Sequence, residues 1–216
     1  FIKNIIFKEE GAEAQTLAVG QGKPYMDKTD QLLTCTAGST VKVTFDKQAN
    51  WMHGYVYIDL DGDKQFSFND GQTDQSGTDV VSFSFYSGDF NNDASGVNSA
   101  GTTLTGGARN TMECPSFVAP VKEGEYRIRF KMDWNSIDAG GQVAADGTCT
   151  GTNGILANGG VIVDATLQVN DGSGVNAVTA DEAQPSIVYD LQGRRVSGNA
   201  ERGIYIRDNR KVMYNR

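Results

Sequence analysis

Carboxylates at alternating positions form the sharpest chemical feature of the sequence. Asp59, Asp61 and Asp63 open the segment DLDGDKQFSFND, which ends at Asp70. Alternating carboxylates converge when the chain curls, and Ca²⁺ binds roughly six to eight oxygen ligands of this kind. We therefore expect a calcium site made by these four aspartates. The alternative is a solvated acidic hairpin turn, in which Gly62 provides the positive φ.

The spacing of this segment is close to that of an EF-type calcium loop. Its three leading aspartates match the first, third and fifth ligand positions, and Gln65 would offer its backbone carbonyl. Lys64 stands where such loops carry glycine for a sharp turn, and Asp70 replaces the usual, longer glutamate. The flanking segments have strand patterns rather than helical ones. The sequence thus indicates a calcium-binding turn after a strand, not an EF-hand.

Residues that could perform hydrolysis are few. His53 is the single histidine, and it lies in the strand-like run WMHGYVY, where we expect a structural role. Asp133 and Asp164 lie within strand-like segments, and nothing in the sequence places them at the separation that a glycosidase uses. The sequence carries no GxSxG, HExxH or phosphate-loop motif. We therefore predict that the chain is not an enzyme. A catalytic alternative would need Asp133 or Asp164 open to a pocket beside another acid.

Four aromatic residues are candidates for stacking against sugar rings: Trp134, Trp51, Tyr86 and Phe90. Trp51 precedes the strand that enters the acidic segment, and Trp134 follows another strand. Side chains at such ends can reach the surface, where an aromatic face can support a sugar. The alternative is that each tryptophan caps the hydrophobic core.

The three cysteines allow one disulfide. Cys114 and Cys149 lie in loop-like sequence, and we predict a bridge between them for an exported protein. Cys35 lies in an alternating segment, which is typical of a buried, small hydrophobic residue. The alternative is three reduced thiols.

Period-two alternation of apolar and polar residues dominates the rest of the chain. No long stretch shows helical periodicity, so the chain is predicted to be all-β, a two-sheet antiparallel sandwich with jelly-roll-like or immunoglobulin-like packing. A small C-terminal β-hairpin unit is expected to follow it. The clearest strand patterns are residues 40–45, 55–58, 81–85, 125–132 and 161–169.

The chain is predicted to divide into a β-sandwich module at 1–170, a linker at 171–184 and a β tail at 185–216. The linker, DGSGVNAVTADEAQ, is a largely polar stretch without a strand pattern. Residues 87–112 and 137–160 are expected to be long loops, because they are rich in Gly, Ser, Asn and Thr.

Charge also separates the tail from the body. Residues 185–216 hold seven basic and three acidic residues, a net charge of 7 − 3 = +4. The whole chain of 216 residues has a net charge of −8, so the remainder carries −12. An acidic body is a poor nucleic-acid binder. No apolar run approaches the ~20 residues of a membrane helix, so we expect no membrane span.

Several of these segments resemble GEVED-type β-sandwich modules of secreted and surface Bacteroidetes proteins. Residues 51–66, WMHGYVYIDLDGDKQF, are similar to the family's aromatic–Ile–Asp strand and loop, although Asp61 and Lys64 replace the usual Asn and Gly. The strand GEYRIRF at 124–130 and the closing strand NGGVIVD at 158–164 extend the likeness. The resemblance implies a non-catalytic module that accompanies enzymes acting on glycans or proteins.

The last thirty or so residues carry a second resemblance. The pattern VYDLQGRRV, followed by GIYIRDNRKVMYNR, looks like the end of a type IX (Por-type) sorting domain, in an abbreviated form. This resemblance implies export, with an extracellular or cell-surface location and the periplasm as the alternative.

Together these features predict a non-catalytic accessory module of an exported bacterial protein. We expect it to bind carbohydrate, or to act beside glycan processing, with a glycan or glycoprotein as partner and Ca²⁺ as a stabilising ion. The alternative is a structural spacer or adhesion module that contacts protein rather than glycan.

Overall fold

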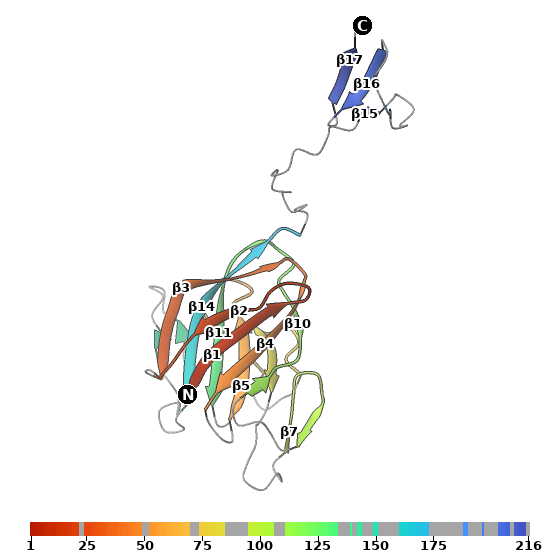
Figure 1. Ribbon diagram of the computed structural model, residues 1–216. Coiled ribbons are helices and arrows are strands. Elements are labelled where there is room, and N and C mark those ends of the chain that lie inside the picture. Colours follow the sequence, from red (N-terminus) through yellow and green to blue (C-terminus); the bar gives the residue numbers. More distant parts are fainter. Residues whose placement is uncertain are drawn as a thin grey trace. The chain divides into compact units, whose positions relative to one another are not determined.

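Two five-stranded sheets stack face to face in the computed structural model (Figure 1). This arrangement confirms the predicted all-β, two-sheet fold. The structure describes residues 1–21, 24–48, 52–69, 74–84, 95–105, 111–133, 139, 142–143, 149–150, 160–172, 188–189, 196, 203–207 and 210–214. Within these residues there is no helix, and hence none that could cross a membrane.

The first sheet has the strand order β10-β4-β1-β2, and β9 also pairs with β4. Its pairings are antiparallel, with Phe7 opposite Val43 between β1 and β4. The predicted strand at 40–45 is the centre of β4. The bounds are β1 Ile2–Glu9, β2 Gln15–Ala18, β4 Thr40–Lys47, β9 Thr111–Glu113 and β10 Phe117–Val118.

The second sheet has the order β3-β14-β11-β5-β6 and contains the other four predicted strands. All its pairings are antiparallel except that of β14 with β3, which is parallel. The antiparallel register places Arg129 opposite Asp164 and Tyr57. The bounds are β3 Tyr25–Thr36, β5 His53–Ile58, β6 Val80–Ser84, β11 Gly124–Asp133 and β14 Val161–Asn170.

The main hydrophobic core lies between the two sheets. Alternate residues of β4 and β11 point into it, as the period of two requires. Phe45 from β4 and Phe130 from β11 meet edge to face across the core, with ring centroids 6.4 Å apart. Side chains pack directly against the backbone of Gly54 beside them, because a Cβ on Gly54 would lie only 2.6 Å from Met112 Sδ.

Short strand pairs occur in the two segments that were predicted to be long loops. β7 (Ser95–Val97) and β8 (Thr103–Thr105) form one antiparallel pair, and β12 (Gln142–Val143) and β13 (Cys149–Thr150) form another. β9 also lies partly within the first segment. The loop predictions were therefore wrong at these strands. Strands of only two or three residues in Gly- and Thr-rich sequence show no alternating pattern from which they could be predicted.

The chain divides into two compact units, Phe1–Ser173 and Gly174–Arg216. The second unit contains a three-stranded sheet in the order β15-β16-β17, with bounds Val188–Tyr189, Gly203–Arg207 and Arg210–Tyr214. β16 and β17 pair antiparallel as far as Arg207 and Arg210. The sheet thus agrees with the short strands expected in the tail.

Candidate functional site

The acidic turn begins where β5 leaves the second sheet. Asp59 follows the last residue of β5 and is only 6% exposed. Its Oδ1 accepts a hydrogen bond from Gly62 N at 2.8 Å, and its Oδ2 accepts one from Lys64 N at 3.1 Å. Its own backbone N donates to Arg127 O on the neighbouring strand at 3.0 Å. The start of the turn is therefore fixed to the sheet.

The next two aspartates shape the turn in the same way. Asp61 Oδ1 accepts from Asp63 N at 3.1 Å, and Asp63 Oδ1 accepts from Gln65 N at 2.7 Å. Carboxylate oxygens of Asp59, Asp61 and Asp63 come within 4.8 Å of one another. Three of the four predicted calcium ligands are thus brought together, whereas Asp70 lies outside the described residues.

Lys64 takes the backbone conformation that a calcium loop gives to glycine. Its φ is +66°, in the left-handed region, and it is the only non-glycine residue of the described chain with a positive φ. Such a conformation costs a non-glycine residue energy and persists only where its surroundings impose it. The chain therefore makes the sharp turn even though lysine, and not glycine, occupies this position.

The surroundings of Asp59 disfavour its charged form. Burial raises the pKa of the Asp59 carboxyl, and the nearby charges of Asp79 and Asp63 raise it further, against the hydrogen bonds from Gly62 and Lys64. A bound cation would relieve both the desolvation and the repulsion between carboxylates.

Asp79 supports the turn from twenty residues further along the chain. Its Oδ1 accepts from Leu60 N at 2.9 Å, and its Oδ2 accepts from both N and Oγ of Ser67 at 2.7 Å. Sequence reasoning missed this residue. The sequence signal that could have identified Asp79 was its position directly before an alternating strand. A carboxylate that is buried at such a position needs hydrogen-bond donors.

A polar pocket of about 280 Å³ opens beside the acidic turn. It is lined by residues 59–62 on one side and by residues 122–127, which lead into β11, on the other. Its charged groups are mainly carboxylates, including Asp61 and Glu125. The pocket gives a cation a route from solvent to the turn.

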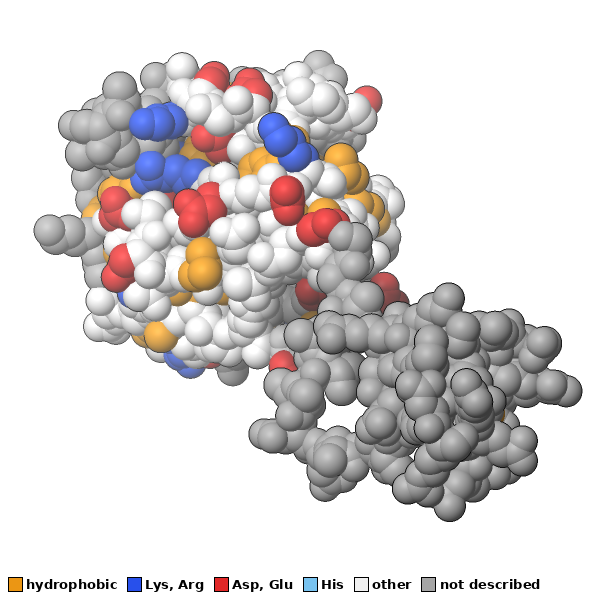
Figure 2. Space-filling model, turned by 90° about the horizontal axis from the view of Figure 1, so that it is seen from above, with side chains coloured by type: hydrophobic (Ala, Val, Ile, Leu, Met, Phe, Trp, Pro, Cys, Tyr) orange, Lys and Arg blue, Asp and Glu red, His pale blue; other side chains and the backbone are white. Residues whose placement is uncertain are grey.

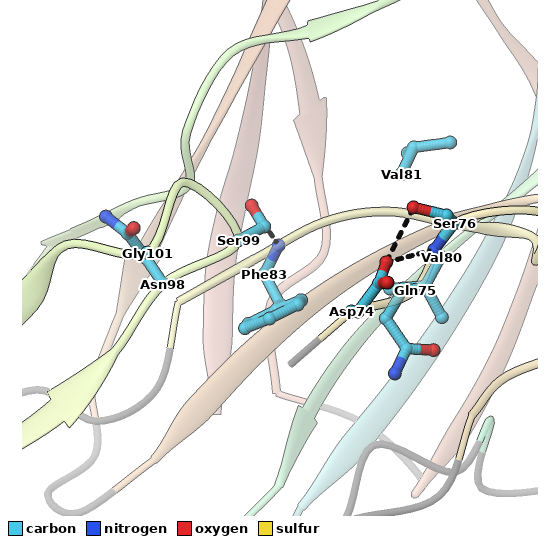
Figure 3. Close-up of a pocket in the computed structure, with 9 residues that line it drawn as sticks. All are labelled: Asp74, Gln75, Ser76, Val80, Val81, Phe83, Asn98, Ser99 and Gly101. Carbon is cyan, nitrogen blue, oxygen red and sulfur yellow. Dashed lines mark hydrogen bonds between the residues drawn. The ribbon is translucent and has the colours of Figure 1, made fainter. Parts of the chain in front are cut away.

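A second pocket of about 380 Å³ lies at the β6 edge of the same sheet (Figure 3). It is lined by residues 74–76, by residues 80, 81 and 83 of β6, and by residues 98, 99 and 101. Its volume falls within the roughly 300–1,000 Å³ of small-molecule sites.

Charged residues are buried on the face of the second sheet that points away from the main core. Arg129 donates to Asp164 through Nε at 2.7 Å and through Nη2 at 2.8 Å, and neither side chain is exposed. Arg127 and Tyr25 complete the cluster around the same carboxylate. The guanidinium of Arg129 also lies over the ring of Phe66, 4.5 Å from its centroid.

The two strand-embedded aspartates are therefore held in ion pairs. Asp133 is 2% exposed and lies 3.5 Å from Lys131 Nζ, while Asp164 binds the two arginines. His53, at the start of β5, contacts Tyr55 through Nδ1 at 3.2 Å. Burial lowers the pKa of His53 to about 4, against the attraction of Asp133, so the ring is neutral at neutral pH.

The structure does not show the predicted disulfide. Cys114 is a free, buried thiol whose Sγ donates to Gly54 O at 3.9 Å, and burial raises its pKa to about 12. Its position among core side chains explains the free state, although the side chain of Cys149 lies outside the described part. Cys35 is buried as expected, and burial raises its pKa to about 11.

The aromatic candidates for sugar stacking, Trp51, Trp134, Tyr86 and Phe90, lie outside the described residues. On the face shown in Figure 2, the described hydrophobic side chains are scattered among acidic and basic ones. That part of the surface is therefore suited to polar contacts.

The chain matches no family model and no curated protein. The resemblances to GEVED-type modules and to a sorting-domain end stay predictions.

Proposed function

We propose that the unit Phe1–Ser173 is a non-catalytic, calcium-stabilised binding module of an exported bacterial protein, with carbohydrate as its ligand. The observation that carries this proposal is the convergence of Asp59, Asp61 and Asp63 in a turn where Lys64 takes the left-handed conformation that calcium loops give to glycine. The ion would hold the loop between β5 and β6, which borders both pockets.

The donor set fits Ca²⁺ on chemical grounds. Hard cations prefer oxygen, and each carboxylate oxygen that accepts a backbone hydrogen bond keeps a second lone pair for a metal. The backbone carbonyl of Gln65 stands at the position that supplies a main-chain ligand in EF-type loops. Asp70 remains the proposed fourth carboxylate.

A non-catalytic role is supported by the environment of the acids that hydrolysis would need. Asp133 and Asp164 are almost completely buried and face cations rather than a second carboxyl group in an open pocket. A glycosidase requires two carboxyl groups that flank the scissile bond. His53 has a half-buried, neutral ring and lies beside Tyr55.

A polar ligand is supported by the two pockets and by the surface. Sugar recognition by β-sandwich modules depends on hydrogen bonds around a small apolar area, and both pockets have polar rims. For residues 185–216, the sorting-like sequence and the net charge of 7 − 3 = +4 support a role in export to the cell surface or beyond.

The second candidate is a structural spacer or adhesion module that contacts protein. Val118, on the terminal strand β10 of the first sheet, is 64% exposed, and nearby Val121 is 82% exposed. Exposed valines at a sheet edge suit a contact with another protein.

Calcium titration of the metal-stripped protein tests the stabilising role of the turn. Isothermal calorimetry should show one Ca²⁺ binding event that saturates, together with a higher melting temperature in Ca²⁺ than in EDTA. An unchanged melting temperature and no binding heat would remove calcium from the proposal.

A further inference from the structure

We propose that the pocket at the β6 edge (Figure 3) holds a single sugar ring through the side chains of Asp74 and Asn98. This inference rests on the proposed carbohydrate-binding function and assigns it a site. The assignment is argued from the two walls of the pocket, its floor and the hydrogen-bonding groups on its rim.

The first wall is the segment before β6, and hydrogen bonds fix its shape. Gln75 exchanges two bonds with the backbone of Asn69, accepting from N at 2.8 Å and donating to O at 2.7 Å. Thr78 closes a turn onto Gln75 O through its backbone N at 3.1 Å and its Oγ1 at 2.8 Å. These hydrogen bonds give the wall its shape without a ligand.

The second wall is the turn at residues 98–101, which is tied to the edge of β6. Ser99 N donates to Phe83 O at 3.0 Å, and Phe83 N donates to Ser99 Oγ at 3.2 Å. Ser82 Oγ donates to Pro115 O at 2.7 Å, so in its contact with Ser99 Oγ at 3.2 Å it is the acceptor. The direction of every hydroxyl proton in this wall is thereby set.

The floor between the walls is formed by Val80 and Phe83, which are 7% and 1% exposed, so it offers a ligand only a small apolar area. Val80 and Phe83 belong to a small hydrophobic cluster on the outer face of the second sheet, with Tyr55 and Tyr57. Figure 3 shows Phe83 between Asn98 on one side and Asp74 with Ser76 on the other. A sugar ring has an apolar C–H face and a rim of hydroxyls, which matches this arrangement of floor and rim.

The rim offers one acceptor and one donor. Asp74 Oδ1 accepts from N and Oγ of Ser76 at 3.0 and 2.6 Å, which lowers the pKa of the exposed carboxyl and leaves Oδ2 for a ligand. Asn98 Oδ1 accepts from the backbone N of Ala100 and of Thr102, both at 3.0 Å. The Nδ2 group of Asn98 has no assigned partner among the described residues, so it can donate to a hydroxyl.

The neighbouring pocket beside the acidic turn suits a different ligand. Its lining carries the carboxylates of Asp59, Asp61, Glu123 and Glu125 together with Lys122 and Arg127, which favours a charged ligand over a neutral ring. Because a preformed site loses little conformational entropy on binding, the pocket at β6, whose walls are held by hydrogen bonds, is the better sugar site.

The acidic turn and the first wall of this pocket belong to the same loop, between β5 and β6. Asp79 Oδ1 accepts a hydrogen bond from Leu60 N of the acidic turn. Asp79 also comes directly after Thr78, which belongs to the first wall of the pocket. Calcium at the turn would therefore steady the wall, and sugar binding should weaken when the metal is removed.

Two isosteric variants separate the rim groups from the fold. Asp74→Asn keeps the Oδ1 that accepts from Ser76 and replaces the Oδ2 acceptor with an NH₂ donor. Asn98→Asp keeps the Oδ1 that accepts from the backbone of the turn and replaces the Nδ2 donor with an oxygen acceptor. Asp30→Asn is the matched control, because Asp30 is exposed on β3, at the opposite edge of the sheet.

The probes are methyl glycosides of glucose, galactose, mannose, xylose and N-acetylglucosamine. Binding of each glycoside is monitored by two-dimensional amide NMR of the full chain in Ca²⁺. At least one glycoside should shift the amides of Ser76, Phe83 and Ser99. Each rim variant should raise its dissociation constant roughly fivefold to tenfold, and the control should not.

Shifts located elsewhere, or binding that both rim variants retain, would overturn this site and leave the proposed function standing. No shift with any glycoside would overturn the inference together with carbohydrate binding. A shift produced only by methylammonium, and lost in Asp74→Asn, would identify a cation pocket and also overturn the inference. Mapping the shifts on the unaltered protein keeps the test valid if a variant misfolds.

Discussion

Arg129 and Asp164 face each other across β11 and β14 and form a two-pronged ion pair with no exposed surface on either side chain. Nε and Nη2 of the arginine donate to separate carboxylate oxygens, and Nη1 donates to Ala139 O at 2.9 Å. The outer face of the second sheet therefore carries a second buried layer, in which ion pairs lie beside a small hydrophobic cluster. It attaches a segment beyond β11 to the sheet.

Removing one partner of this pair should be strongly destabilising. Asp164→Asn leaves Arg129 with a buried charge and no counter-ion, so we expect urea denaturation to show a loss of about 3–5 kcal/mol in the free energy of unfolding.

The double variant Arg129→Met with Asp164→Leu is the matched comparison for that loss. It removes both charges and should cost clearly less than Asp164→Asn alone. A single variant that is as stable as the unaltered protein would show that the pair is not needed.

The acidic turn should respond to calcium through Asp61. Asp61→Asn removes one of three converging carboxylates, so the melting temperature in Ca²⁺ should fall below that of the unaltered protein. In EDTA the two proteins should melt at similar temperatures, because asparagine keeps the Oδ1 that accepts from Asp63 N and no metal is present to lose a ligand.

Asp30→Asn changes the net charge equally and should leave both melting temperatures unchanged. An equal loss for Asp61→Asn in both buffers would assign this aspartate to the fold of the turn instead of to a metal.

His53 should make stability fall in acid. Its pKa is lowered from 6.5 to about 4 in the folded state, chiefly by burial, so the unfolded chain binds the proton first. The stability that the neutral His53 ring contributes is fully present above pH 6.5 and is lost as pH falls toward 4. Urea denaturation across this range should show a loss on the order of 2–3 kcal/mol relative to His53→Gln. Parallel pH profiles for the two proteins would refute the buried, neutral histidine.

Gly54 should tolerate no side chain. A Cβ there would lie 2.6 Å from Met112 Sδ and 2.9 Å from Phe45 Cε2, so Gly54→Ala should cost about 1–3 kcal/mol in unfolding free energy by overpacking.

Met112 supplies the control for this clash. Met112→Ala should be less harmful in the Gly54→Ala background than alone, because it removes the closest atom. Additive losses in the double variant would contradict the packing explanation.

The sandwich could be predicted from sequence because its strands carry the signal of a half-buried sheet. In β11 the alternation of Ile128, Phe130 and Met132 with polar residues directed one face inward, and all three lie in the main core. Strands of two or three residues, such as β12, are too short to leave such a pattern.

The buried polar face could not be predicted in the same way. Arg129 and Lys131 read as solvent-facing residues of an amphipathic strand, yet both are fully buried. Their burial depends on Asp164 and Asp133, and on residues beyond the sheet such as Phe66 and Ala139. Contacts between distant parts of a chain leave no local period.

The candidate site was partly predictable for a related reason. Asp59, Asp61 and Asp63 are neighbours in sequence, so a turn brings them together and their spacing is visible. Asp79 and Asn98 join their sites only through the pairing of β5 with β6 and the attachment of the following turn. Those relationships appear only in the folded chain.

A glycan array probed with the purified protein, in Ca²⁺ and again in EDTA, tests the proposed function most directly. The account predicts that a defined set of glycans retains the protein in Ca²⁺ and retains it less in EDTA, since the metal steadies the loop between β5 and β6. Arrays without bound protein in both buffers would contradict carbohydrate binding and favour the spacer or adhesion role.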